Sequence, residues 1–138
     1  MSTPPLPAFV DSEVLKALIE DKTKVPGKDY LVIDVRDEDR VGGHIPGSVN
    51  IPSKQLPDQL PALVRQYADV PQLFFHCALS QIRGPKAAAR WSEAVTERGG
   101  DSSSIKILRG GFGDWQRKHK DDKNLVEAYE AEYWIEDY

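Results

Sequence analysis

The chain has 138 residues, enough for one domain, of which 40% are hydrophobic and 29% charged. This composition supplies a core and excludes an intrinsically disordered chain. No apolar run approaches the roughly 18 residues that span a bilayer, and the N-terminus lacks the basic and apolar regions of a signal peptide. A single cysteine excludes an internal disulfide framework and favours a reducing compartment, so we expect a location in the cytosol or the nucleus.

The net charge of −4 argues against nucleic-acid binding, and the acidity is concentrated near the C-terminus. Residues 120–138 carry seven acids and two lysines, whereas the rest of the chain is close to neutral and would not repel an anionic substrate. We expect a flexible N-terminus at residues 1–5, a catalytic domain at residues 6–119 and an acidic tail at residues 120–138.

Strand-like and helix-like segments alternate along the chain. Residues 30–35 form an almost continuous apolar run, which is typical of a strand covered on both faces. In chain order, the patterns predict a helix at 13–21, strands at 30–35 and 48–51, a helix at 59–67, a strand at 73–76, a helix at 85–98 and a strand at 105–108. This alternation predicts a single α/β domain, a three-layer α/β/α sandwich with a central, mainly parallel sheet.

The strongest chemical signal lies at residues 75–85, which read Phe-His-Cys-Ala-Leu-Ser-Gln-Ile-Arg-Gly-Pro between a predicted strand and a predicted helix. The amides of such a loop can converge on one point, and the helix that follows adds its positive N-terminal end, so the segment can bind an oxyanion. Arg83 offers a planar fork that matches two oxygens of that anion. The same positive surroundings favour Cys77 as a nucleophilic thiolate.

We therefore expect Cys77 and Arg83 to be catalytic, with His76 and Gly84 as supporting residues. A buried structural thiol is the alternative for Cys77, and a satisfied histidine at a strand end is the alternative for His76. The three histidines of the chain show no ligand spacing, so we expect neither a metal nor another cofactor. The expected substrate-binding residues are Ala78, Leu79, Ser80, Gln81, Ile82 and Arg83.

With these residues the chain resembles the rhodanese-like superfamily, specifically its Cdc25-type phosphatase branch, over residues 6–118. Residues 33–36 read Ile-Asp-Val-Arg, residues 43–50 read Gly-His-Ile-Pro-Gly-Ser-Val-Asn, and residues 108–115 read Leu-Arg-Gly-Gly-Phe-Gly-Asp-Trp. These motifs match, in order, a strand end, a turn and a closing segment of that family. In length and in the sequence of this loop, the chain is similar to small fungal Cdc25-like phosphatases and to eukaryotic arsenate reductases.

Most of these additional motif residues are expected to be structural. Asp34, Arg36 and His44 should satisfy one another or nearby backbone beneath the loop. Gly110 and Gly111 should turn the chain into a short helix that packs against the core.

The resemblance implies hydrolysis of phosphate monoesters through a phosphocysteine intermediate, with a phosphorylated protein or a small aryl phosphate as substrate. From the net charge and the lack of a long apolar run, we expect neither nucleic acid nor membrane as partner. Arsenate reduction is the alternative, and with one cysteine it would require an external thiol such as glutathione, with glutaredoxin. Sulfur transfer is disfavoured because sulfurtransferases of this fold have a loop one residue shorter. A non-catalytic anion-binding module is disfavoured because the cysteine and the arginine are both present.

One departure from the larger Cdc25 phosphatases concerns the general acid. Those enzymes place acids directly after the cysteine and directly before the arginine, where this chain has Ala78 and Ile82. The loop therefore contains no residue that can protonate a leaving group. Glu38, Asp39 and Asp114 are the acids elsewhere in the chain that we consider for this role.

Overall fold

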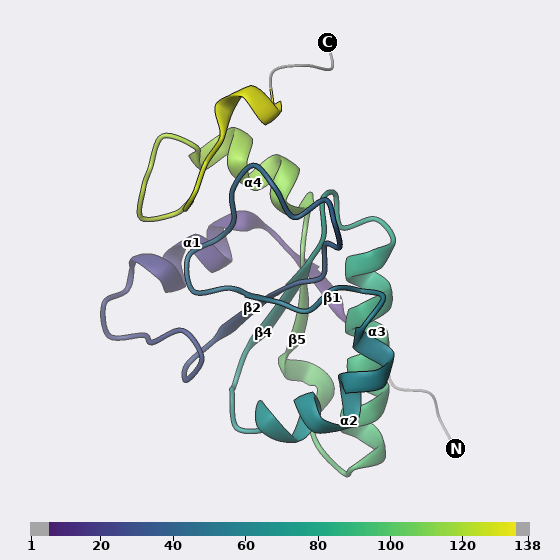
Figure 1. The fold of residues 1–138 in the computed structure, drawn as a ribbon. Helices are drawn as coiled ribbons and strands as arrows, with labels where there is room; N and C mark the ends of the chain where they lie inside the picture. The colour runs from purple at the N-terminus through teal and green to yellow at the C-terminus, as the bar shows by residue number, and fades with distance from the viewer. Residues whose placement is uncertain (1–5, 135–138) are drawn as a thin grey trace.

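A central parallel sheet organises the domain in the computed structural model, which describes residues 6–134. The segment expected to be flexible at 1–5 and the last four residues of the expected acidic tail lie outside the described residues. Within them, five strands are arranged in the order β1-β5-β4-β2-β3, and all neighbours pair in parallel (Figure 1). The strands are β1 (Ala8–Val10), β2 (Leu31–Asp34), β3 (Val49–Asn50), β4 (Leu73–His76) and β5 (Ile105–Leu108).

Helices cover both faces of the sheet, which confirms the predicted α/β fold with three layers (Figure 1). One face carries α2 (Leu56–Gln66) and α3 (Arg83–Glu97). The other carries α1 (Ser12–Glu20) and α4 (Gly111–His119). Two short 3₁₀ turns, η1 (Ser102–Ser104) and η2 (Ala131–Trp134), complete the described elements.

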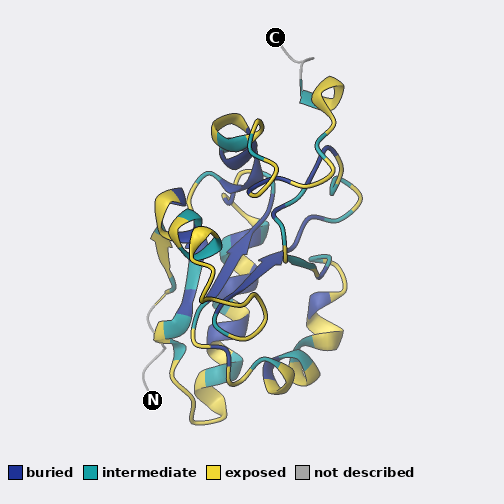
Figure 2. Ribbon diagram, turned by 90° about the vertical axis from the view of Figure 1, so that its left-hand side faces the viewer, coloured by how far each residue is buried: buried dark blue, intermediate teal, exposed yellow. Residues whose placement is uncertain are grey.

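The core is divided by the sheet, because successive strand residues point to opposite faces. Leu31, Ile33 and Phe75 pack with Trp91 of α3 on one side. Residues of the alternating set, such as Val32 and Phe74, pack with Leu15, Phe112 and Trp115 on the other. Every residue of β2 and β4 is buried, as the dark central strands of Figure 2 show. The continuous apolar run that predicted β2 therefore reflects burial on both faces.

The predicted boundaries agree closely with the structure for the central strands and less well elsewhere. The strands at 73–76 and 105–108 have the expected limits. Helix α2 begins three residues earlier than expected and has Pro57 in its first turn. A proline is tolerated there because a backbone N–H in the first turn has no acceptor within the helix. Strand β1 was not predicted, because its three residues are too short and too exposed to show a period.

The carboxyl ends of the parallel strands meet at one edge of the sheet. The pairing places Asp34 of β2 beside His76 of β4, and Phe75 beside Ile107 of β5. The loops that follow β2, β4 and β5 therefore leave the sheet side by side, as expected for ligand sites in open α/β sheets. Gly110, at φ 79°, then leads the chain from β5 into α4.

At Gly111 a side chain would collide with the backbone of the Cys77 loop. Its φ is 61°, and a Cβ atom there would lie 2.6 Å from the carbonyl oxygens of Cys77 and Ala78. Gly99 offers a matched control, because its φ is 81° but nothing lies within 4 Å of its Cβ position.

We predict that Gly111→Ala destabilises the fold far more than Gly99→Ala. Both variants carry the strain of an L-residue at positive φ, about 1 kcal/mol, but only the first also forces two backbone carbonyls apart. Denaturant unfolding would measure both changes in the free energy of unfolding. Equal losses would show that the Cys77 loop and α4 are not in rigid contact.

Candidate active site

The loop after β4 places the thiol of Cys77 at the N-terminus of α3. The amide of Gly84 donates a hydrogen bond to the Cys77 Sγ over 3.3 Å, and Cys77 as a whole is 3% exposed. A Cβ on Gly84 would lie 3.3 Å from the Cys77 nitrogen and the His76 Cα, so a side chain there would be crowded against the loop backbone. The N-terminal end of a 15-residue helix thus favours negative charge on or beside this sulfur.

The backbone of the same loop is held from outside by α4. The amides of Phe112 and Gly113 donate to the carbonyls of Cys77 and Ala78, over 3.0 and 2.8 Å. In a trans peptide the N–H points opposite to the C=O, so the amides of Ala78 and Leu79 point away from α4. This contribution of α4 was not predicted, although the Gly110-Gly111 pair is the sequence signal that would reveal it.

Six consecutive amides of the loop, those of residues 78–83, donate to no acceptor within residues 6–134. Ser80 lies at their centre with a φ of 55°, and its buried hydroxyl also has no partner in that part of the chain. Successive free amides in such a turn form an anion-binding nest. The loop therefore offers donors for the oxygens of a tetrahedral anion next to the thiol. The hydroxyl of Ser80 does not bond the loop backbone, so it is available to a ligand.

Arg83, at the first turn of α3, is bound by two acids from the loop after β2. Its two terminal nitrogens donate to the two oxygens of Asp39 over 2.8 and 2.7 Å, and one also contacts Asp37 at 3.3 Å. The hydrogen bond from Arg83 lowers the pKa of Asp39, and the pair correspondingly raises the pKa of Arg83. Both side chains are therefore charged near neutral pH.

A buried ion pair lies beneath the loop. Asp34 and Arg36, both at most 1% exposed, share several hydrogen bonds, the shortest 2.8 Å, and Arg40 adds one of 3.2 Å to Asp34. The Arg36 guanidinium also donates to the Gly43 carbonyl and lies 4.5 Å from the centre of the Phe112 ring. These contacts satisfy both charges, as expected, and they join the C-terminal end of β2 to the loop that follows it.

His76 is a buried residue with a backbone partner. Its Nδ1 lies 3.0 Å from the Cys77 carbonyl, which can only accept, so Nδ1 carries the hydrogen. Burial lowers the pKa of His76. The ring is thus neutral and supports the loop through the Cys77 carbonyl rather than through the sulfur. Its Nε2 lies 4.0 Å from Asp34 and has no hydrogen-bond partner in the described residues.

His44 differs from the expectation, because it does not contact Asp34 or Arg36. Its ring lies 3.1 Å from the Glu127 carboxylate, and the backbones of the two residues exchange hydrogen bonds. The reason is that the chain after α4 folds back over the turn at residues 42–44. In that returning segment Leu125 and Val126 are buried, so part of the acidic C-terminal region packs on the domain.

The three acids considered as proton donors occupy different surroundings. Glu38 is largely exposed and lies 3.4 Å from Lys54. Asp114 pairs with Arg117 at 2.6 Å on the surface of α4. Asp39 faces the site but is held as a carboxylate by Arg83. Each of the three acids therefore faces a basic side chain, and none of them is aimed at the loop as a free carboxyl group.

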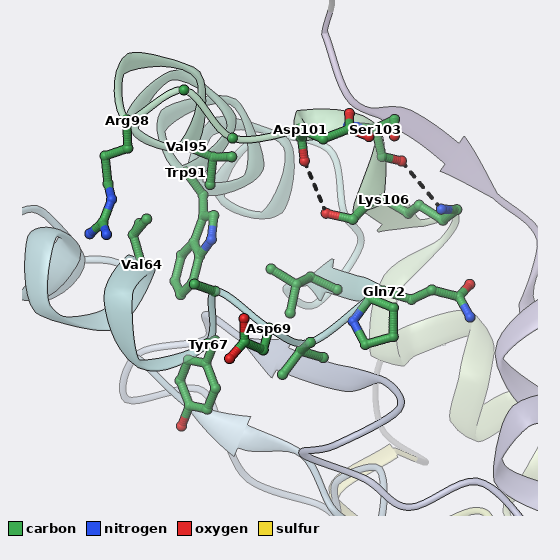
Figure 3. A pocket seen from close by; sticks show the side chains of 17 residues that line it. Val64, Tyr67, Asp69, Gln72, Trp91, Val95, Arg98, Asp101, Ser103 and Lys106 are labelled. Atoms are coloured by element: carbon green, nitrogen blue, oxygen red, sulfur yellow. Dashed lines mark hydrogen bonds between the residues drawn. The ribbon is translucent and has the colours of Figure 1, made fainter.

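A cavity of about 650 Å³ lies at the opposite end of the sheet (Figure 3). It is lined by Trp91, Val95, Arg98 and Tyr67, together with residues that precede β4 and β5, and it includes no residue of the Cys77 loop. Its charged groups show no convergent arrangement, and Lys106 there donates to the Ser103 carbonyl. The cavity is therefore separate from the Cys77 loop, where the candidate nucleophile lies.

In residues 6–134, no group of three or more His, Cys, Asp or Glu side chains is arranged to hold a metal ion. Over the same residues, each helix is too short or too polar to cross a bilayer.

Comparison with known proteins identifies the family. Residues 11–118 match the rhodanese-like domain. The chain is 42% identical over 92 residues to "Dual specificity phosphatase Cdc25" of Arabidopsis thaliana, a match that covers 64% of this chain but only 63% of that relative. It is 35% identical over 141 residues to "Dual specificity phosphatase ibp1" of Schizosaccharomyces pombe, covering 87% of this chain and 96% of that protein. The chain belongs to the rhodanese-like domain family.

Other relatives broaden the range of named activities. "Arsenate reductase 2.1" of Oryza sativa is 35% identical over 112 residues, covering 79% of this chain and 67% of that protein. The solved structure of Ygr203w, described as a yeast protein tyrosine phosphatase of the rhodanese family, has a TM-score of 0.74 and 29% identity, covering 95% of this chain and 99% of that one. These relatives confirm the resemblance to Cdc25-like phosphatases and arsenate reductases that the motifs indicated.

We predict that Asp34→Asn destabilises the protein by about 3 kcal/mol at neutral pH, because it leaves Arg36 buried without its counter-charge. Burial opposes ionisation of Asp34, but the charge of the His76 ring, when that ring is protonated at low pH, and the hydrogen bonds and charge of Arg36 lower the pKa of Asp34 to about 2. The folded-state pKa lies below the unfolded value, so this stabilisation is present above about pH 4 and is lost as the pH falls toward 2.

Urea unfolding across that pH range would test this, with the exposed Asp69→Asn as control. The difference between wild type and Asp34→Asn should shrink on acidification, whereas the control should differ little at any pH. A constant difference would mean that the charge of Asp34 does not stabilise the fold.

Proposed function

We propose that the chain is a cysteine-dependent phosphatase that hydrolyses phosphate monoesters through a phosphocysteine at Cys77. One observation carries the proposal. The thiol lies at the N-terminus of α3, beside six loop amides that have no acceptor within residues 6–134. A nucleophile and a set of donors for equatorial oxygens come together from one short segment, which is what phosphoryl transfer requires.

In the first step, the Cys77 thiolate attacks phosphorus in line with the leaving oxygen. A phosphorus–sulfur bond forms and the phosphorus–oxygen bond to the leaving group breaks. The loop amides and Arg83 hold the three equatorial oxygens, over which the charge of the transition state is spread. The leaving oxygen departs with the bonding electron pair and takes its proton from solvent, because no acid lies in the loop.

In the second step, water attacks phosphorus and the phosphorus–sulfur bond breaks. Inorganic phosphate leaves, the water proton passes to solvent, and the Cys77 thiolate is restored. The Gly84 amide, 3.3 Å from Sγ, stabilises the departing thiolate. The same donors thus serve both halves of the cycle.

The proposed substrate is a phosphorylated protein of the phosphotyrosine type, or a small aryl phosphate. Leu79 and Ile82 are 52% and 74% exposed on the loop, and they offer apolar surface for an aromatic ring beside the phosphate. A phenolate is also a better leaving group than an alkoxide, which suits a site without a general acid. A cytosolic or nuclear location agrees with the need for a reduced thiol.

Arsenate reduction is the second candidate, and a relative named an arsenate reductase supports it. Arsenate is nearly the same size and shape as phosphate and fits the same donors. Reduction to arsenite takes two electrons, which two thiols supply as they form a disulfide. With one cysteine, this chain would form that disulfide between Cys77 and an external thiol such as glutathione, and glutaredoxin would reduce it.

One experiment compares the two functions. The purified chain is assayed in parallel on an aryl phosphate, and on arsenate with glutathione and glutaredoxin. We expect the higher catalytic efficiency on the aryl phosphate. Arsenite formation without release of inorganic phosphate would instead assign the chain as an arsenate reductase.

We predict that Cys77→Ser lowers kcat by about a thousandfold or more but still binds an oxyanion. The nucleophile is lost, but the amides and Arg83 remain. Calorimetry with tungstate and steady-state assays of the same preparation would measure both properties. Turnover equal to wild type in this variant would overturn the mechanism.

We also predict a steep dependence on the leaving group. Rates for a series of aryl phosphates should fall as the pKa of the free phenol rises, when phosphorylation of Cys77 limits turnover. Phosphoserine peptides should be much poorer substrates than phosphotyrosine peptides. A flat dependence that becomes steep after Glu38→Gln or Asp114→Asn would identify a proton donor and contradict this reading.

A further inference from the structure

The pairing of Arg83 with two acids raises the question of what those acids do. Asp39 could donate a proton to the leaving group, compete with the substrate for the guanidinium, or fix the guanidinium in place. The contacts of the described residues distinguish these roles.

The acids occupy one side of the Arg83 guanidinium and leave another side open. Asp39 takes its end-on face, since both terminal nitrogens of Arg83 donate to it. A guanidinium has a second, lateral face formed by Nε and one terminal nitrogen. The Nε of Arg83 donates to no acceptor in residues 6–134. Both members of the ion pair can therefore stay in place while the lateral face binds an anion.

The second observation is that the acids are themselves fixed. Asp37 accepts from the hydroxyl of Ser53 at 2.6 Å and from the amide of Lys54 at 3.1 Å. The amide of Asp37 in turn donates to Asp39 at 2.9 Å. The first two bonds anchor the Asp37 carboxylate to the chain that follows β3, and the third anchors the Asp39 carboxylate to the backbone of Asp37. A carboxylate tethered in this way is suited to hold a flexible arginine and poorly suited to swing toward a leaving group.

The third observation concerns charge. The hydrogen bond from Arg83 is the main cause of the lowered pKa of Asp39, so this acid has no proton to give near neutral pH. The pKa of Asp37 is lowered too, because hydrogen bonds from Ser53, Lys54 and Arg83 outweigh its partial burial. The sulfur of Cys77 is also close enough to act electrostatically on Arg83.

We propose that Asp39, supported by Asp37, is a positioning residue that holds the end-on face of Arg83 so that the lateral face is presented to the oxyanion beside Cys77. This inference rests on the proposed function for its kinetic consequences but not for its effect on anion binding. It assigns Asp39 to the arginine rather than to proton transfer.

The test uses Asp39→Asn in the full chain, with Glu38→Gln as the matched control. Glu38 is the adjacent residue, so its variant removes the same charge from the same loop without touching Arg83. Two readouts are taken: the dissociation constant of tungstate by calorimetry, and kcat/KM across a series of aryl phosphates. Melting temperatures are recorded for each variant, and only folded preparations are compared.

We expect Asp39→Asn to weaken tungstate binding and to lower kcat/KM, each by roughly ten- to a hundredfold, because a misplaced arginine loses its alignment with the anion. The loss should be the same for good and poor leaving groups. Asp39→Glu, which keeps the bidentate carboxylate, should recover part of the affinity, and Glu38→Gln should bind and react like wild type.

Other outcomes overturn the inference in distinguishable ways. Tighter tungstate binding by Asp39→Asn would make Asp39 a competitor of the substrate. A loss confined to poor leaving groups would make it the proton donor. A lower kcat with unchanged tungstate affinity would reduce it to a structural role. If the wild type binds tungstate but hydrolyses no aryl phosphate, the proposed function fails while the calorimetric comparison still decides the role of Asp39.

Discussion

The site depends on how the backbone after β4 is held between two helix N-termini. From one side, the first turn of α3 places the Gly84 amide on the Cys77 sulfur. From the other, the first turn of α4 binds the carbonyls of Cys77 and Ala78 through its amides. With those carbonyls fixed outward, the planar peptides turn the next amides away from α4. The loop amides are thus free for an anion because the loop carbonyls are bound by α4.

A second constraint is the position of two ion pairs relative to the loop. Asp34 and Arg36 form a buried pair beneath the loop, whereas Asp39 and Arg83 form a half-buried pair at its edge. Both pairs involve the chain that leaves β2, so this one segment supports the loop from below and fixes its arginine. The buried pair serves the fold, because each charge would be costly alone. The edge pair serves the site, because it leaves part of the arginine available.

The sequence predicted the parts of the structure that repeat or that depend on short spacing. The continuous apolar run of β2 and the short apolar segments of β3, β4 and β5 were predicted as strands, and the segment between β4 and α3 showed its chemistry in a few adjacent residues. The partners that come from distant segments were not predicted. Three contacts depend on tertiary folding. They are the hydrogen bonds from α4 to the loop, the pairing of Arg83 with Asp39, and the contact of His44 with Glu127 across 83 positions. No local pattern records such pairings.

The central claim is that Cys77 becomes phosphorylated during turnover. The most direct measurement mixes the protein briefly with excess aryl phosphate, quenches the reaction and determines peptide masses. The account predicts one added phosphoryl group on the peptide that contains Cys77, with none on the same peptide from Cys77→Ser. Continued turnover with no phosphoryl group on that peptide, or with the group on another residue, would contradict it.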